Sequence, residues 1–292
     1  GRGLAAAWGW HRAWAGIPEV VSLMVTLAAL PANWSPERRR EAWRETAALI
    51  QAYAGPNDAV LLYPDYLRSA LERYSDGDQP LFTPFTEALA DPATIDGPLQ
   101  GLSSFDATWL VESHHESLDP ANLLSGWFAA RYPLITEQFP AGVLVHAFAT
   151  RYRTVELPAY VPALNPQASL GPLQLLACVH DPGPLAATDD LYHPPSNWVH
   201  VTTYWTAGET PTVDIIPQVR LVDQAGQVWG DKLKRGNDAI HMWPTSRWIP
   251  GEVVRVDSDV NLNPITPPGR YRLVVGLPEG GESVVCGEVE IK

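Results

Sequence analysis

The spacing of apolar residues differs between the two halves of the chain. Between residues 35 and 156, short unbroken apolar runs alternate with segments that are apolar at helical spacing. Unbroken runs are typical of buried parallel strands. Strands are expected at 59–63, 107–111 and 142–149, and helices at 35–54, 66–74 and 119–132. This alternation predicts an α/β domain over 35–156, with a Rossmann-like parallel sheet covered by helices.

Beyond this domain the apolar period becomes two. Residues 157–172 are rich in proline and lack periodicity, which predicts an extended linker. The segments that then alternate are 173–180, 198–206, 213–222, 227–232, 252–262, 271–277 and 283–291. About seven short strands at this spacing indicate an all-β, immunoglobulin-like sandwich over 173–292.

Residues 1–34 form an apolar head that predicts a short N-terminal helix. Its apolar run, 15–30, is shorter than the roughly 20 residues that span a bilayer, and it contains Pro18 and Glu19. Tryptophans at both ends resemble an interfacial aromatic belt. The head is therefore either the end of a transmembrane helix or a buried or interfacial helix. The chain begins with Gly1 rather than Met, so we expect a part of a longer protein.

Composition narrows the class of protein. A net charge of −13 argues against a nucleic-acid surface, which needs clustered basic residues. The only cysteines are Cys178 and Cys286, too few for a zinc site by themselves. They would form a disulfide in an oxidising compartment, or otherwise stay as buried thiols.

Two sets of residues are candidate ligand-binding sites. Ligands of α/β folds bind beyond the carboxyl ends of the strands. There the sequence places Asp65 and Tyr66 after the first strand, and His114, His115 and Glu116 after the second. A histidine pair flanked by acids suits metal or acid–base chemistry, although a solvated loop has the same composition.

The second candidate is a pair of aromatic residues in the predicted sandwich. Trp243 and Trp248 flank the loop 244–247 and would be exposed enough to stack on a sugar. The structural alternative is that they are core residues, because tryptophan is often buried between the sheets of a sandwich. No glycine-rich phosphate loop or nucleophile elbow is present, so the motifs assign no catalytic residue, and an independent α/β enzyme working at His114 and His115 is the hypothesis with the least support.

Several stretches together resemble the C-terminal, extracytoplasmic part of bacterial family 39-type glycosyltransferases. Those membrane enzymes are related to dolichyl-phosphate-mannose protein mannosyltransferases. The stretches are 41–44 (EAWR), 55–64 (GPNDAVLLYP), 108–111 (TWLV), 131–134 (RYPL), 243–248 (WPTSRW), 250–254 (PGEVV) and 267–273 (PPGRYRL).

The resemblance implies a parent enzyme that transfers a sugar from a polyprenyl-phosphate donor at the outer face of the cell membrane. Its catalytic acid and any divalent metal would belong to an earlier loop, so this part would hold no cofactor and would serve acceptor recognition or partner docking. Its partners would be the parent transmembrane domain, the membrane, and a glycan or protein acceptor. The alternative is a membrane-anchored or secreted carbohydrate- or protein-binding module without enzyme activity.

Overall fold

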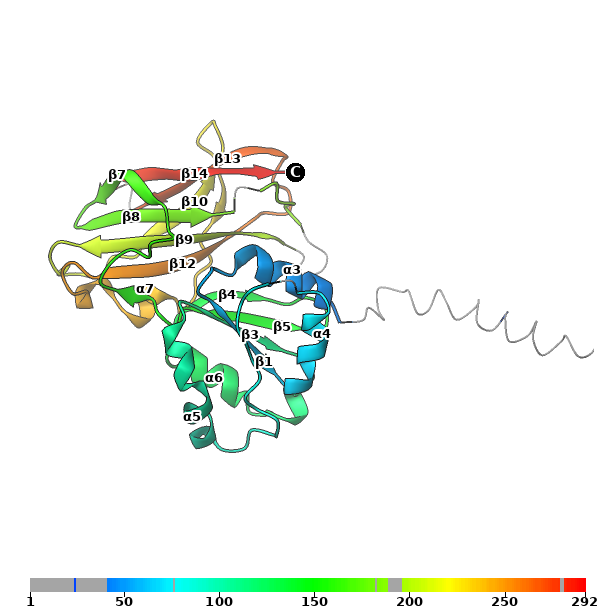
Figure 1. Ribbon diagram of the computed structural model, residues 1–292. Helices are drawn as coiled ribbons and strands as arrows, with labels where there is room; N and C mark the ends of the chain where they lie inside the picture. Colours follow the sequence, from blue (N-terminus) through cyan, green and yellow to red (C-terminus); the bar gives the residue numbers. More distant parts are fainter. Residues whose placement is uncertain (1–23, 25–40, 76, 182, 189–195, 279–280) are drawn as a thin grey trace, which may run out of the picture. The chain divides into compact units, whose positions relative to one another are not determined.

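A five-stranded mixed sheet, here called sheet A, lies in the first half of the described chain (Figure 1). The computed structural model describes residues 24, 41–75, 77–181, 183–188, 196–278 and 281–292. The strand order of sheet A is β2-β1-β3-β5-β4. Its strands are β1 Ala59–Tyr63, β2 Leu81–Phe82, β3 Thr108–Glu112, β4 Leu134–Gln138 and β5 Leu144–Phe148.

Short helices cover both faces of sheet A (Figure 1). The α-helices are α3 Trp43–Tyr53, α4 Arg68–Glu72, α5 Asp96–Leu99 and α6 Leu123–Ala129, and the 3-10 turns are η2 Asp65–Leu67, η3 Pro92–Thr94, η4 Gln100–Ser104 and η5 His115–Ser117. Helices α3 and α4 pack with Val60 and Leu62 of β1, whereas α5 and α6 pack with Leu61 and Tyr63. Successive residues of a strand point to opposite faces, so β1 is apolar throughout.

The predicted Rossmann-like parallel arrangement is wrong. Only β2, β1 and β3 run parallel, whereas β5 is antiparallel to both β3 and β4. The loop 139–143 between β4 and β5 is too short for the crossover that parallel neighbours need. The apolar pattern does not identify β4, and without it the direction of β5 is misassigned. The fold is mainly β, and its longest described helix, α3, has 11 residues.

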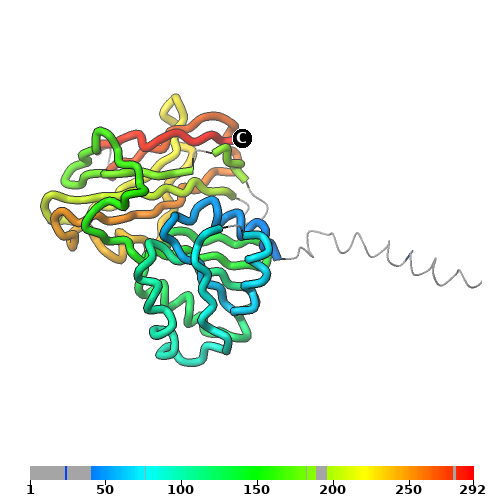
Figure 2. Tube along the Cα trace, viewed as in Figure 1, coloured from blue at the N-terminus to red at the C-terminus, as the bar shows by residue number. Residues whose placement is uncertain are grey.

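The predicted β-sandwich is confirmed by two antiparallel sheets (Figure 2). Sheet B has the order β6-β12-β9-β8-β7 and sheet C the order β11-β10-β13-β14. The elements are β6 Arg153–Thr154, β7 Ala163–Leu170, β8 Leu173–His180, β9 Trp198–Ala207, β10 Gln218–Val222, β11 Val228–Asp231, α7 Ala239–Met242, η6 Thr245–Arg247, β12 Val253–Asn261, β13 Gly269–Gly276 and β14 Ser283–Ile291. All seven predicted strands are present. Strand β7 lies inside the predicted linker 157–172, and the immunoglobulin-like class stays a prediction.

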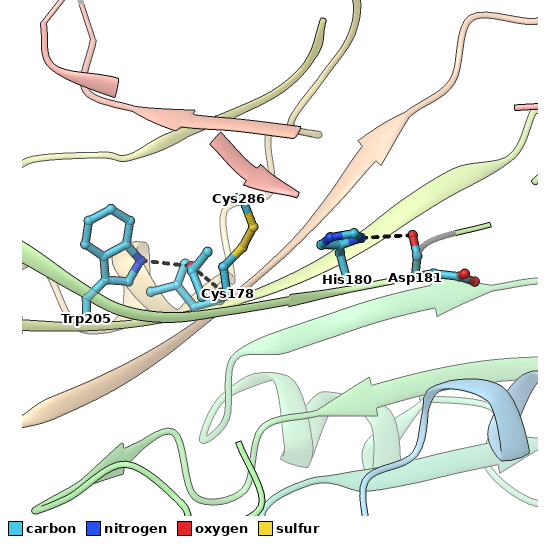
Figure 3. Close-up of a disulfide and its surroundings, with 7 residues drawn as sticks. Cys178, His180, Asp181, Trp205 and Cys286 are labelled. Atoms are coloured by element: carbon cyan, nitrogen blue, oxygen red, sulfur yellow. Dashed lines mark hydrogen bonds between the residues drawn. A yellow bond between two sulfur atoms is a disulfide. The ribbon is translucent and has the colours of Figure 1, made fainter. Parts of the chain in front are cut away.

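An apolar core fills the space between sheets B and C. Trp205 and Val256 of sheet B pack in it with Leu273 of sheet C, all nearly inaccessible to solvent. Beside this core a disulfide joins Cys178 of β8 to Cys286 of β14, with the Cα atoms 5.9 Å apart (Figure 3). The two cysteines, whose pairing the sequence left open, therefore tie sheet B to sheet C.

Residues Trp43–Lys292 form one compact unit, so sheet A and the sandwich contact each other directly. The predicted apolar head lies outside the described residues except for Met24. Within the described ranges, no helix is long and apolar enough to cross a membrane.

Candidate functional site

The two faces of sheet B differ in chemistry along the same pair of strands. On the inner face the cross-strand pairs of β12 with β9 are Val254–Trp205, Val256–Thr203, Ser258–Val201 and Val260–Val199. On the outer face they are Arg255–Tyr204, Asp257–Thr202, Asp259–His200 and Asn261–Trp198. An outer face of a sandwich is ordinarily solvated. Here the Asp257 and Asp259 side chains are only 3% and 1% exposed.

Sheet A covers this outer face through strand β4. The Thr136 hydroxyl donates a hydrogen bond to Asp259 Oδ2 at 2.6 Å. Arg235, in the segment after β11, donates from Nη2 to the same oxygen at 2.6 Å and from Nη1 to the Ile135 carbonyl at 2.9 Å. A backbone bond of 2.8 Å from Leu134 N to the Asn237 carbonyl extends this contact. Direct polar bonds therefore hold β4 against β12.

The charges at this contact alternate in sign from one side chain to the next. We call them the charged seam, which consists of Glu112, His146, Glu137, Arg235, Asp259, His200, Asp257 and Arg255. With both histidines protonated, four cations face four carboxylates. A buried charge is stable only when it is paired, so the alternation is what permits burial.

His200 lies at the sandwich side of the charged seam. Its Nδ1 is 2.7 Å from Asp259 Oδ1, and its Nε2 is 3.4 Å from Asp257 Oδ1. Burial alone would lower the pKa of His200, but hydrogen bonding to the two aspartates raises it to about 9. Burial alone would raise the pKa of both aspartates; Arg255 and His200 nevertheless lower that of Asp257, and His200 and Arg235 lower that of Asp259. His200 is therefore an imidazolium at neutral pH.

His146 on β5 occupies an equivalent position at the sheet A side. Its Nε2 is 2.8 Å from Glu137 Oε1, and its Nδ1 is 3.9 Å from Glu112 Oε2. Burial opposes the charge, but Glu112 and Glu137 raise the pKa of His146 to about 9. The hydrogen bond from His146 in turn lowers the pKa of Glu137, against the effect of burial.

A cavity of about 280 Å³ opens where α3, β4, β9 and β12 meet, and we call it the seam cavity. Its lining includes Glu45, Tyr53, Thr136, Gln138, Asn197, Trp198, His200 and Asp259. Gln138 is 7% exposed, and its Oε1 accepts no hydrogen bond from any described residue. The Asn197 Oδ1 accepts the backbone N–H of Trp198 at 2.8 Å, which leaves its amide N–H groups as donors. The cavity thus combines unused polar groups with aromatic side chains.

The arrangement suits binding better than proton transfer. Acids contact both ring nitrogens of His200 and the Nε2 of His146, and the Nδ1 of His146 is buried, so neither imidazole offers an accessible nitrogen to a substrate proton. Among the described residues, no group of three or more His, Cys, Asp or Glu side chains could hold a metal ion. The floor of the cavity, His200 with Asp259, is compensated in charge, so a neutral polar ligand fits best.

The site predicted at the ends of β1 and β3 lies at one edge of sheet A, because these strands are parallel neighbours. Asp65 and Tyr66 are in η2, where Tyr66 is 56% exposed. His114 is exposed with a left-handed backbone (φ 51°), and His115 and Glu116 begin η5. The buried acids that flank this loop are used elsewhere, because Glu112 belongs to the charged seam and Asp119 accepts the backbone N–H groups of Leu123 and Leu124.

Trp243 and Trp248, the predicted aromatic pair, are not both exposed as sugar stacking requires. Trp248 is 1% exposed, so the expectation of an exposed ring is wrong at this position. Its Nε1 donates to the Trp243 carbonyl at 3.0 Å. Trp243 is half-buried, and the guanidinium of Arg153 lies 3.7 Å from a ring centroid of Trp243, a cation–π contact that occupies one face.

The charged seam was not predicted from the sequence, although all of its strands except β4 were. Arg255, Asp257 and Asp259 recur at every second position of the predicted strand 252–262. Such alternation ordinarily indicates a solvated face. The available signal was a second polar face. His200, which can carry a positive charge, and Thr202 alternate in the same way on the neighbouring predicted strand.

Comparison with known proteins adds no family assignment. No family model, curated protein or solved structure matches this chain. The resemblance to family 39-type glycosyltransferases therefore stays a prediction.

Proposed function

We propose that this chain is a glycan-recognition region without catalytic activity, the extracytoplasmic C-terminal part of a polyprenyl-phosphate-sugar-dependent membrane glycosyltransferase. The seam cavity holds a sugar unit of the acceptor. The observation that carries this proposal is the buried Gln138 carbonyl oxygen, which lines the seam cavity without a hydrogen-bond donor. A buried acceptor of this kind is costly unless a ligand or water satisfies it.

The chemistry of the lining supports a neutral polyol. A sugar hydroxyl both donates and accepts hydrogen bonds, so it matches the Gln138 oxygen, the Glu45 carboxylate and the Asn197 amide together. The aromatic side chains Tyr53 and Trp198 add apolar surface, as ligand sites generally do. A volume of about 280 Å³ is near the lower end for ligand pockets, which suits one sugar unit.

Binding by the full chain tests the site. We expect saturation-transfer NMR to detect at least one of a panel of neutral methyl glycosides, and Gln138→Met to weaken its binding about tenfold, because the buried acceptor is lost. Gln227→Met, in the exposed turn between β10 and β11, is the matched control and leaves binding unchanged. Failure of every glycoside to bind, or equal binding by Gln138→Met, would contradict the proposal.

The parent enzyme is tested separately at the level of the gene. A reading frame that continues upstream of Gly1 into many apolar spans supports the glycosyltransferase. A start codon near Gly1 supports the alternative, a stand-alone binding module. Sugar transfer by the isolated chain would contradict the proposal that this part is not catalytic.

A further inference from the structure

Lysine is concentrated in one place of this acidic chain. The sequence contains three lysines, Lys232, Lys234 and Lys292, against a net charge of −13. Two of them line a second cavity of about 530 Å³ on the sandwich. We call it the lysine groove, and its charged lining consists of Lys232, Lys234, Arg235, His241, Asp238 and Asp214. Basic side chains thus outnumber acidic ones in the lysine groove, although the chain as a whole is acidic.

The acids of the lysine groove already have partners. Asp238 Oδ2 is 2.8 Å from the Lys232 ammonium, and its Oδ1 accepts from His241 Nδ1 at 2.6 Å. The Lys232 and Asp238 side chains are only 7% and 3% exposed, so this ion pair forms a rigid wall. Asp214 Oδ1 accepts the backbone N–H of Ser246 at 3.1 Å. Hydrogen bonding to Ser246, with the nearby charge of Arg247, lowers the pKa of Asp214, so each of the two acids already has a cation close to it.

Lys234 is the cation that these pairings leave over. Its side chain is exposed in the groove, and no acid of the described residues pairs with its ammonium. Arg235 is engaged with Asp259 and with the Ile135 carbonyl, so its planar fork is not free for bidentate binding. An arginine fork binds carboxylate and phosphate alike, whereas a lysine acts as a point charge, which attracts a doubly charged phosphate more strongly than a singly charged carboxylate. The groove therefore favours a phosphate group over a carboxylate.

We propose that the lysine groove binds a small molecule that carries a phosphate group, with the Lys234 ammonium as its main contact and the Lys232–Asp238 pair as its wall. The lysine groove and the seam cavity share no lining residue. Arg235 lines the groove and belongs to the charged seam through its bond to Asp259. The function of the lysine groove does not depend on the glycan proposal. Exposed Ile216 lies at the same groove and offers apolar contact for the rest of the molecule.

Calorimetry on the full chain at low ionic strength tests this proposal, because salt weakens such contacts. The probes are inorganic phosphate and glycerol 3-phosphate, with glycerol as the neutral comparison. We expect both phosphates to bind and glycerol not to bind. Lys234→Gln should weaken phosphate binding about tenfold. Lys292→Gln, the third lysine of the chain and also exposed, should leave it unchanged.

Two further arms identify the source of the phosphate and the site. Vesicles of phosphatidylcholine with phosphatidic acid test whether the phosphate belongs to a lipid headgroup, and vesicles of phosphatidylcholine alone are the control. Binding that needs both the phosphatidic acid vesicle and Lys234 would assign the phosphate to a lipid. It would then overturn the proposal that the ligand is a small molecule. In acetylation followed by mass spectrometry, phosphate should protect Lys234 but not Lys292. Absence of phosphate binding, or equal loss in both lysine variants, would overturn the proposal.

Discussion

The inner and outer faces of β9 and β12 use the same two strands for different purposes. The inner face packs valine and tryptophan side chains into the core between sheets B and C. The outer face carries the sandwich half of the charged seam, and sheet A covers it. Apolar burial stabilises the inner face without regard to direction. Paired charges must meet at defined distances, so the outer face fixes where sheet A docks and leaves a polar cavity beside it.

The largest expected effect of a substitution comes from the disulfide, which belongs to the sandwich and not to the charged seam. Replacing Cys178 and Cys286 by alanine opens a covalent link with a sequence separation of 108 residues. In the chain-entropy model a loop of this length stabilises by about 5 kcal/mol. We expect the free energy of unfolding in urea to fall by several kcal/mol, while the pKa of His200 stays raised. A fall in both would show that the outer face depends on the disulfide.

A second substitution acts on the outer face alone. Asp259→Ala removes the partner of His200, Arg235 and Thr136, and leaves buried cations unpaired. We expect a loss of about 3–5 kcal/mol in urea unfolding at neutral pH.

Val260→Ala, its neighbour on the inner face, is the matched control for that substitution. It should lower the free energy of unfolding by about 2 kcal/mol at every pH. The Asp259→Ala effect should instead shrink above pH 9, where His200 is no longer charged. Identical pH dependence of the two losses would contradict the proposed difference between the faces.

The third effect is the pH dependence of the wild-type chain. His146 and His200 have pKa values raised to about 9 in the folded state. Their stabilisation is complete below the unfolded pKa of about 6.5 and is lost as the pH rises through 9. The raised pKa values set an upper bound of about 3 kcal/mol for each histidine, and the melting temperature should fall by roughly 10 °C over this range. Calorimetry at several pH values compares the melting temperature of the wild type with that of a His146→Gln, His200→Gln double variant. An equal dependence of the melting temperature on pH in both proteins would contradict this prediction.

The smallest expected effect concerns the seam cavity. Gln138→Met keeps the volume of the side chain and removes an oxygen that has no hydrogen-bond partner among the described residues, together with the Nε2 group that donates a long hydrogen bond of 3.3 Å to the Thr136 hydroxyl. We expect the free energy of unfolding to change by less than about 1 kcal/mol, or to rise. If the replacement weakens glycan binding but leaves the fold equally stable, Gln138 serves the ligand and not the fold. A large loss of stability would instead assign Gln138 to the structure.

The sandwich was predictable from sequence because each strand buries one face, and a period of two records that directly. The direction of β5 was not, because it depends on β4, whose residues 134–138 carry no clear alternation. The charged seam was not identified from the sequence for a related reason. A strand such as β12 records which side chains lie on one face, but not what covers that face. Whether the outer face of β12 meets water or strand β4, with the Thr136 hydroxyl on Asp259, is decided by the docking of sheet A.

The most direct test of the charged seam is an NMR titration of the histidine ring nitrogens, with His200 assigned by the His200→Gln variant. We predict that the His200 imidazole of the wild-type chain titrates near pH 9. Asp259→Asn, which keeps the shape of the side chain and removes its charge, should move the titration back towards its ordinary range. A wild-type His200 that titrates near its ordinary pKa of about 6.5 would contradict a buried, charge-paired outer face.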